Sequence, residues 1–198
     1  MARNKALKSR EEIIDISFDI INNEGAIALS ARRLAKELNV SFMTIYNYVE
    51  NIDDIKKEVI LRGFQILNER IYESIIKDNL DLNKLDLKNY CLTVAREIFR
   101  FSESNNGVYQ LMFINGETKL YKDPEVAPFY IYYTQLINIK RNDKFDKNKK
   151  ILHILYLIIH GLIRENIFGH RNYTETEYID YIDYFVSNFI NGQEVNNG

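Results

Sequence analysis

Residues 30–49, SARRLAKELNVSFMTIYNYV, decide the fold of this chain. A first helix is predicted to begin after Ser30, whose hydroxyl can accept a hydrogen bond from a free backbone N–H of the first turn. Asn39 then tolerates the left-handed backbone conformation that a tight turn between two helices needs. The buried face of the first helix carries four apolar residues at the helical period: Ala31, Leu34, Ala35 and Leu38.

A second, shorter helix is predicted after Ser41, another capping residue, with Val40, Ile45 and Val49 as its buried stripe. Its outward positions are Phe42, Met43, Thr44, Tyr46, Asn47 and Tyr48. A short helix can enter a DNA major groove when its inner side packs against the core and its outer side exposes apolar and hydrogen-bonding side chains. The same spacing also fits an ordinary helical hairpin that does not bind DNA. The rest of the chain has to distinguish between these two interpretations.

The composition favours an all-helical globular protein. Of 198 residues, 46% are hydrophobic and 27% are charged, as in ordinary soluble domains, and there are only two prolines and eight glycines. The net charge of −2 counts against a protein that coats nucleic acid non-specifically. Site-specific binding needs only a local basic face, which this charge allows.

The N-terminus is locally basic and has two interpretations. Its first ten residues carry four basic side chains and no acidic one: Arg3, Lys5, Lys8 and Arg10. They could form an arm near DNA phosphates or simply a disordered solubilising start. Cys91 is the only cysteine, so no intrachain disulfide is possible. With no signal peptide and no apolar run of roughly 20 residues, a cytoplasmic protein is expected.

Apolar residues recur at the helical period along the remainder of the chain. Gly25 is suited to end the first helix, and Thr174 with Glu177 forms a capping box for the last. Polar segments at 102–107 and 141–150 are predicted to be loops. With the two hairpin helices, about nine helices are expected, the others at 8–24, 53–77, 87–101, 108–115, 128–140, 149–168 and 174–191.

The last two predicted helices are too apolar to be covered within one small bundle, so we expect them to pair with their copies in a homodimer. Gly161 would allow close backbone approach, or it is a tolerated core glycine. The predicted dimer interface comprises His153, Leu157, Gly161, Arg164, Tyr181, Phe185 and Phe189.

A ligand cavity is expected among the middle helices, lined by Phe64, Phe99, Tyr109, Phe113, Tyr133, Tyr156 and His160. The alternative is that most of these aromatic residues are simply core. His153 and His160 fit interface histidines first, effector contacts second and metal ligands third, because no cysteine cluster accompanies them. No nucleophile elbow, phosphate-binding glycine loop or catalytic carboxylate pair is present, so neither an enzyme, a cofactor nor a metal site is predicted.

The N-terminal part of the chain resembles the TetR/AcrR family of bacterial regulators over about fifty residues. The first-helix pattern is carried by Arg10, Ile13, Ile14, Ser17, Ile20, Ile21 and Gly25. The hairpin pattern is carried by Ser30, Leu34, Ala35, Leu38, Val40, Ser41, Ile45, Tyr46, Tyr48, Val49 and Ile55.

This resemblance implies a dimeric, ligand-responsive repressor in which residues 1–50 bind operator DNA and residues 51–198 bind a small-molecule effector and dimerise. Ser30, Tyr46 and Tyr48 would contact phosphates, and Arg32 would contact a base. The full predicted set of DNA contacts is Ser30, Arg32, Ser41, Phe42, Met43, Thr44, Tyr46, Asn47, Tyr48 and Lys56.

Two positions depart from the family pattern. Ile52 stands where the family usually has a phosphate-binding lysine, although Lys56 follows one turn later, and Asn39 replaces the usual turn glycine. The apolar Phe42 and Met43 can contact thymine methyl groups, which predicts an A·T-rich pseudopalindromic operator.

The alternative is an all-helical protein-interaction module that does not bind DNA. A positive surface beside the second hairpin helix would favour the DNA-binding hypothesis. An acidic surface there would favour the interaction module. The residues that decide between them are Arg32, Arg33, Lys36 and Lys56.

Overall fold

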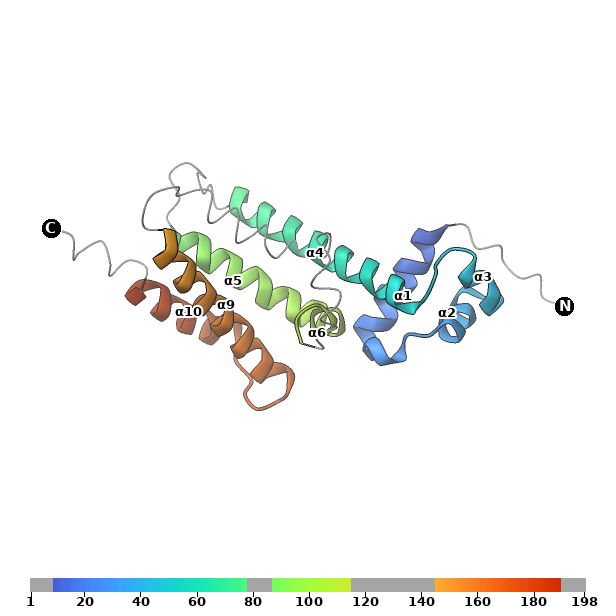
Figure 1. Cartoon of the computed structure of the whole chain (residues 1–198). Helices are drawn as coiled ribbons and strands as arrows, with labels where there is room; N and C mark the ends of the chain where they lie inside the picture. Colours follow the sequence, from blue (N-terminus) through green and yellow to red (C-terminus); the bar gives the residue numbers. More distant parts are fainter. Residues whose placement is uncertain (1–8, 78–86, 115–144, 190–198) are drawn as a thin grey trace. The chain divides into compact units, whose positions relative to one another are not determined.

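The computed structural model describes residues 9–77, 87–114 and 145–189 of the chain (Figure 1). These residues form eight α-helices and one short 3₁₀ helix, and no strand occurs among them. The predicted all-α fold is confirmed. The helix predicted at 128–140, with Tyr133, lies outside the described residues.

The chain divides into two compact units, the first formed by Met1–Gln65 and Asn105–Val126. Its core contains apolar side chains with no exposed surface, among them Ile13, Ile21, Leu34, Ile45 and Ile55. The unit contains α1 (Arg10–Glu24), η1 (Ala26–Ala28), α2 (Ala31–Leu38), α3 (Phe42–Tyr46), the first part of α4 (Ile52–Lys77) and α6 (Asn106–Phe113).

The ends of α1 are set by the residues that flank it. The Ser9 hydroxyl accepts a hydrogen bond from the backbone N–H of Glu12 at 3.3 Å. At the other end Gly25 has a φ of 83° and donates its N–H to the Ile21 carbonyl at 2.9 Å. The predicted role of Gly25 is therefore confirmed, since this backbone conformation favours glycine.

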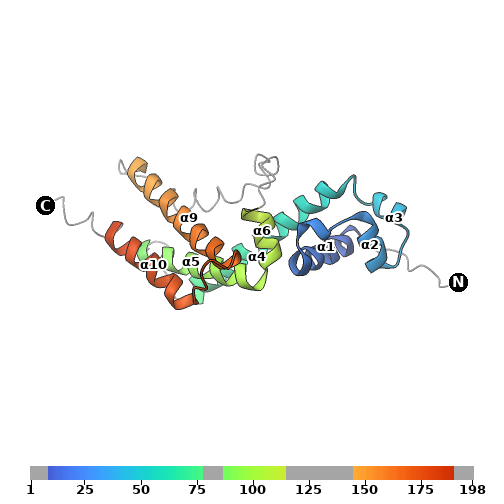
Figure 2. The same cartoon turned by 90° about the horizontal axis from the view of Figure 1, so that it is seen from below.

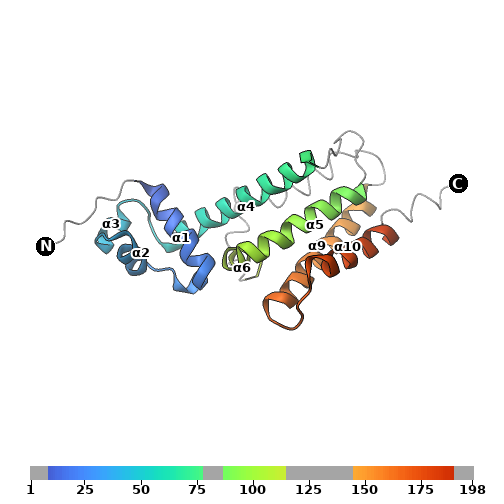
Figure 3. The same cartoon turned by 180° about the vertical axis from the view of Figure 1, so that it is seen from behind.

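The second unit is formed by Ile66–Ser104 and Ala127–Gly198. It contains the remainder of α4, α5 (Leu87–Ser104), α9 (Phe145–Ile167) and α10 (Glu175–Phe189). Figures 2 and 3 show α5, α9 and α10 side by side, and these three helices pack on one another. At their centre Tyr178 is fully buried, with its hydroxyl donating to the Ala95 carbonyl at 3.2 Å and its ring 4.7 Å from that of Phe99.

Two predicted loops are shorter than expected. The segment 102–104 continues α5, because the Ser102 hydroxyl donates to the Phe99 carbonyl and the Ser104 hydroxyl to the Arg100 carbonyl, at 2.7 and 2.9 Å. Serines that bond back in this way are compatible with a helix. The loop predicted at 141–150 is likewise wrong from residue 145 on, where α9 begins.

The predicted capping box of the last helix is confirmed. The Thr174 backbone N–H donates to a Glu177 carboxylate oxygen at 2.9 Å, and the Glu177 N–H donates to the Thr174 hydroxyl at 3.3 Å. The Thr174 hydroxyl also donates to the same carboxylate oxygen at 2.8 Å, and the two bonds that Thr174 donates lower the pKa of Glu177. Among the described residues, no helix is long and apolar enough to cross a membrane. The functional boundary at residue 50 stays a prediction, because the first unit by contacts extends further along the chain.

Candidate nucleic-acid interface

The turn between α2 and α3 is built as the sequence predicts. Ser30 caps α2, its hydroxyl accepting from the Arg33 N–H at 3.1 Å. Asn39 ends the helix in the left-handed conformation, with φ 54° and ψ 46°. The next residue, Val40, donates its N–H to the Ala35 carbonyl at 3.0 Å. Asparagine therefore serves where the family usually has glycine, as a single left-handed residue.

Helix α3 is short and is fixed at both ends. The Ser41 hydroxyl accepts from the Thr44 N–H at 3.2 Å and shares a 2.8 Å hydrogen bond with the Thr44 hydroxyl. Ile45 has no exposed surface and Val49 only 4%, so both lie in the core of the first unit. Val40, predicted for the same buried stripe, is half-buried. The inner side of α3 is thus held against the core and its outer side is left to solvent.

The outer side of α3 is unusually apolar. Phe42, Met43 and Tyr46 have exposed fractions of 50%, 59% and 45%. Such large apolar groups are costly to leave in water, and together on one short helix they indicate a surface that contacts something else. Of the other predicted DNA contacts, Ser30, Ser41 and Asn47 are exposed, and Thr44 and Tyr48 are half-buried.

Only part of the predicted positive surface is available to a ligand. Arg33 is paired with Glu24 at 2.7 Å and with Glu37 at 3.0 Å, so its charge is balanced within the protein. Arg32 and Lys36, one turn apart on α2, are both exposed, and neither makes an ion pair within the described part of the chain. Lys36 was predicted as part of the deciding positive surface, though not as a DNA contact, and its i, i+4 spacing from Arg32 places both side chains on one face of α2.

The start of α4 offers little to a phosphate. Ile52 begins the helix and is half-buried. The Lys56 side chain is only 17% exposed and its ammonium lies 3.4 Å from a carboxylate oxygen of Asp53. Of the predicted DNA contacts, Lys56 is therefore the one whose placement fits its role least. Asn51 caps the helix, accepting from the Asp54 N–H at 2.9 Å.

The sequence and structure of the chain were compared with those of known proteins. No protein-family profile matches the chain. An uncharacterized HTH-type transcriptional regulator of Bacillus subtilis strain 168, YobS, is 22% identical over 198 residues, covering 96% of this chain and 94% of its own. The crystal structure of a transcriptional regulator from Rhodococcus sp. Rha1 superposes with a TM-score of 0.72 at 15% identity, covering 93% of this chain and 97% of its own.

A member of the TetR family from Streptomyces coelicolor A3 superposes with a TM-score of 0.62 at 14% identity, over 89% of this chain and 96% of that one. The chain has the fold of the TetR family of transcriptional regulators. In that fold the α2–α3 hairpin is the helix-turn-helix, as the sequence predicted. The relatives found are regulators, which agrees with the prediction that this protein is not an enzyme.

The aromatic residues predicted to line an effector cavity are divided between the two units of this TetR fold. In the first unit the Phe113 ring lies 5.6 Å from that of Phe64 and 4.9 Å from that of Tyr109, centroid to centroid. In the second unit Phe99 packs on Tyr178 as core. Tyr156 and His160 lie together on α9, their ring centroids 4.3 Å apart, and burial lowers the pKa of His160 to about 3. The cavity itself stays a prediction.

Most of the residues predicted for a dimer interface are exposed to solvent on α9 and on α10. On α9, Leu157 is 54% exposed and His153, Gly161 and Arg164 are exposed at helical spacing. On α10, Tyr181 and Phe189 are 53% and 50% exposed. Phe185 is the exception, because it is buried within the protomer with its ring stacked 4.9 Å from that of Phe189.

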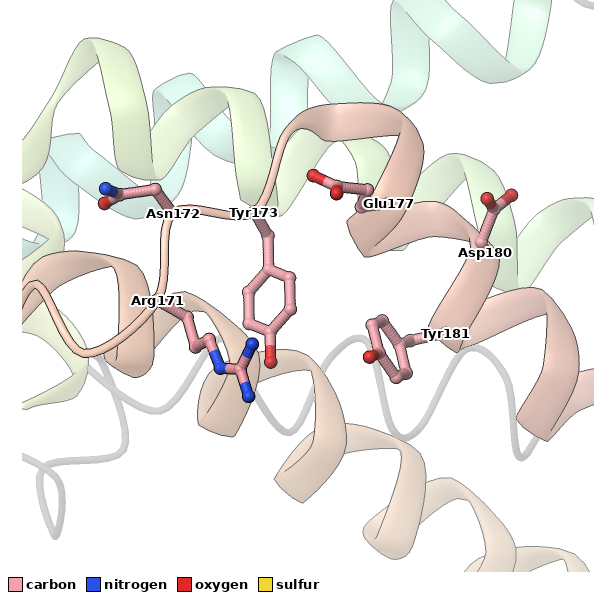
Figure 4. A pocket seen from close by; sticks show the side chains of 6 residues that line it. All are labelled: Arg171, Asn172, Tyr173, Glu177, Asp180 and Tyr181. Carbon is pink, nitrogen blue, oxygen red and sulfur yellow. The ribbon is translucent and has the colours of Figure 1, made fainter.

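A surface hollow of about 310 Å³ lies at the connection between α9 and α10 (Figure 4). Beside it, Asn166 both donates to the Tyr173 carbonyl and accepts from the Tyr173 N–H, at 3.0 and 2.8 Å. The hollow is lined by Arg171, Asn172, Tyr173, Glu177, Asp180 and Tyr181. Five of these six side chains are exposed, so the hollow is open to solvent. Within the described residues no cluster of three or more metal-ligating side chains occurs.

Proposed function

We propose that the protein is a one-component, ligand-responsive transcriptional repressor that binds a pseudopalindromic operator as a homodimer. The proposed contact with DNA is the reader surface, which we define as six exposed side chains of the α2–α3 hairpin: Arg32, Lys36, Phe42, Met43, Tyr46 and Asn47. Glu37, which is also exposed on α2, pairs with Arg33 and is not part of this surface. Ser30, Ser41, Thr44 and Tyr48 border it and would contact phosphates or bases.

One observation carries this proposal: two unbalanced cations lie beside an exposed apolar helix. Arg32 and Lys36 are exposed and form no ion pair among the described residues, in a chain whose net charge is −2. DNA supplies what both halves of this surface need, phosphates for the cations and thymine methyl groups for Phe42 and Met43. A protein-interaction module would account for the apolar groups but leaves the two cations without a role.

The direct test is the affinity of Arg32→Ala for operator DNA, measured by fluorescence anisotropy on the DNA upstream of its own gene. If Arg32 reads a base, the variant loses roughly 1–3 kcal/mol of binding and discriminates less at one base position. Lys36→Ala serves as the matched control, because a lost phosphate contact weakens all sequences alike. An unchanged affinity in both variants would favour the interaction module.

The homodimer is supported by the exposed side of α9 and α10. Apolar side chains that are about half exposed on two neighbouring helices form the kind of patch that soluble monomers rarely leave uncovered. They include Ile154 and Leu157 on α9, and Tyr181 and Phe189 on α10. Analytical ultracentrifugation of the wild-type protein at micromolar concentration should show a dimer, and Leu157→Arg should shift it toward monomer. Glu103→Lys, on the exposed side of α5, controls for the added charge.

The proposed switch runs through α4, the helix that continues from the first unit into the second. An unidentified small molecule bound by the C-terminal part would displace α4 and so alter the spacing of the two reader surfaces in the dimer. It can do so only if it binds one arrangement more tightly than the other. A gel-shift on the upstream DNA with a panel of candidate ligands tests this, since an effector must change the bound fraction. A cytoplasmic location, expected from the sequence, is part of the same proposal.

A further inference from the structure

The guanidinium of Arg10 joins three segments of the first unit that lie far apart in the sequence. Its Nη2 lies 3.1 Å from Asp54 Oδ1 and 3.0 Å from Glu58 Oε1, both on α4. Its Nη1 lies 3.5 Å from the carbonyl oxygen of Tyr48, directly after α3. The second carboxylate oxygen of Asp54 accepts the backbone N–H of Glu50 at 3.4 Å. Arg10 and Asp54 thus hold both ends of the connection between α3 and α4.

This arrangement is too exposed to serve mainly for stability. The side chains of Arg10 and Asp54 are 43% and 26% exposed, and exposed ion pairs contribute little to folding. It also speaks against the role of Arg10 in a phosphate-binding arm, because its charge already faces two carboxylates. What the pair does fix is the path of residues 48–50, which set the orientation of α3 relative to α4.

We propose that Arg10 and Asp54 are positioning residues for DNA recognition: together they hold the end of α3 so that the reader surface meets the groove. The inference rests on the proposed DNA-binding function. Neither residue touches the DNA in this account, so their loss should weaken specific binding and leave non-specific, phosphate-driven binding nearly unchanged.

Asp54→Asn separates positioning from simple electrostatics. Removal of a negative charge near DNA should by charge alone strengthen binding, whereas loss of positioning weakens it. We expect Asp54→Asn and Arg10→Gln each to weaken operator binding by about three- to tenfold, and the double variant to be no weaker than either single one, since both remove the same contact. Arg10→Lys, which keeps the charge, should retain part of the affinity.

Asp53→Asn is the matched control. Asp53 lies beside Asp54 in the first turn of α4 and its loss changes the charge equally, but its side chain is 73% exposed and its ion pair is with Lys56 on the same helix. It should bind the operator as tightly as the wild type or slightly more tightly. Circular dichroism melts of all variants check that the protein is folded at the assay temperature.

The decisive experiment measures the affinity of these variants for operator and for unrelated DNA across a salt series. The inference is supported if Asp54→Asn and Arg10→Gln lose operator affinity with an unchanged salt slope and with no comparable loss of affinity for unrelated DNA. It is overturned if Asp54→Asn behaves like Asp53→Asn, or if Arg10→Gln lowers the salt slope by about one, as a lost phosphate contact would. If the wild type binds no DNA specifically, the proposed function fails instead.

A second measurement needs no DNA. In the free protein the Glu50 amide, which donates to Asp54, should exchange its hydrogen faster in Asp54→Ala, which removes the acceptor, than in Asp53→Ala. Equal exchange rates in these two alanine variants would show that Asp54 does not hold this connection, and would overturn the inference independently of binding.

Discussion

Gly107, near the start of α6, packs directly on the carbonyl oxygen of Ile21 in the last turn of α1, and the space between them cannot hold a side chain. The neighbouring carbonyl oxygen, that of Asn22, would lie 2.8 Å from a Cβ at position 107. Because both obstacles are backbone atoms, they cannot rotate away. Glycine is therefore required for α6 to lie on the end of α1.

Gly107→Ala should accordingly destabilise the first unit by about 1–3 kcal/mol, the usual cost of forcing extra atoms into a packed contact. Urea unfolding measures this loss. Gly63→Ala is the control, because its new Cβ would meet side-chain atoms only, the Met112 sulfur at 2.5 Å and the Val108 Cγ1 at 3.0 Å, rather than fixed backbone. A Gly107→Ala variant as stable as Gly63→Ala would contradict the tight α1–α6 contact.

Phe42, half exposed on α3, is expected to contact a thymine methyl group. Replacement of operator thymines by deoxyuridine removes only those methyl groups. The wild type should then bind about three- to tenfold more weakly at one or two positions, whereas Phe42→Ala, which has already lost the contact, should not respond further. Fluorescence anisotropy titrations of both proteins on both DNAs give the four affinities that this comparison needs. Equal responses would show that Phe42 does not contact the methyl group.

Ile52→Lys is predicted to bind operator more tightly than the wild type. Ile52 begins α4, where the family usually has a phosphate-binding lysine, and the half-buried Lys56 already faces Asp53. One added phosphate contact should steepen the salt dependence of log Kd by about one. Gln65→Lys places the same charge on the same helix about 20 Å further on and should have no such effect. A gain of equal size in both variants would mean that only net charge matters.

His160, whose side chain is half-buried with its Nε2 out of contact with solvent, makes stability depend on pH. Burial lowers the pKa of this group to about 3, from about 6.5 when exposed, so it stays neutral in the folded protein. The unfolded chain takes up a proton below about pH 6.5, and stability must fall from there toward pH 3, by up to about 1.4 kcal/mol per pH unit. His160→Gln should lack this contribution.

Chemical denaturation of the wild type and His160→Gln between pH 7 and pH 4 checks the prediction. Carboxylates titrate in both proteins, so only the difference between the two curves reports on His160. That difference should shrink or reverse as the pH falls. Two parallel curves would show that the histidine is accessible to protons in the folded state.

Local sequence signals predicted the hairpin and most helix ends, because each depends on residues a few positions apart. Asn39 takes the left-handed turn, and Thr174 caps the last helix as its spacing with Glu177 predicted. The exposed side of α3 also followed from periodicity, since Ile45 and Val49 had to face the core. The same signals predicted the end of α5 too early, because a polar side chain such as that of Ser102 can form its hydrogen bond within the helix.

Features that depend on distant residues could not be predicted. Arg10 pairs with Asp54, 44 positions away, and nothing in the sequence near Arg10 distinguishes that role from a phosphate contact. Composition likewise could not tell that Phe64 and Phe99 belong to different compact units. Nor could it show that Glu24 balances the charge of Arg33, whereas no described residue forms an ion pair with Arg32.

The central claim is that the α2–α3 hairpin of this chain reads a DNA sequence. Selection from a random double-stranded DNA library by the purified wild-type protein, at about physiological salt, tests it most directly. The account predicts enrichment of an A·T-rich pseudopalindrome with half-sites about one helical turn apart or a multiple of it, and a weaker enrichment with Arg32→Ala. Recovery of no common sequence, or of only G·C-rich half-sites, would contradict it.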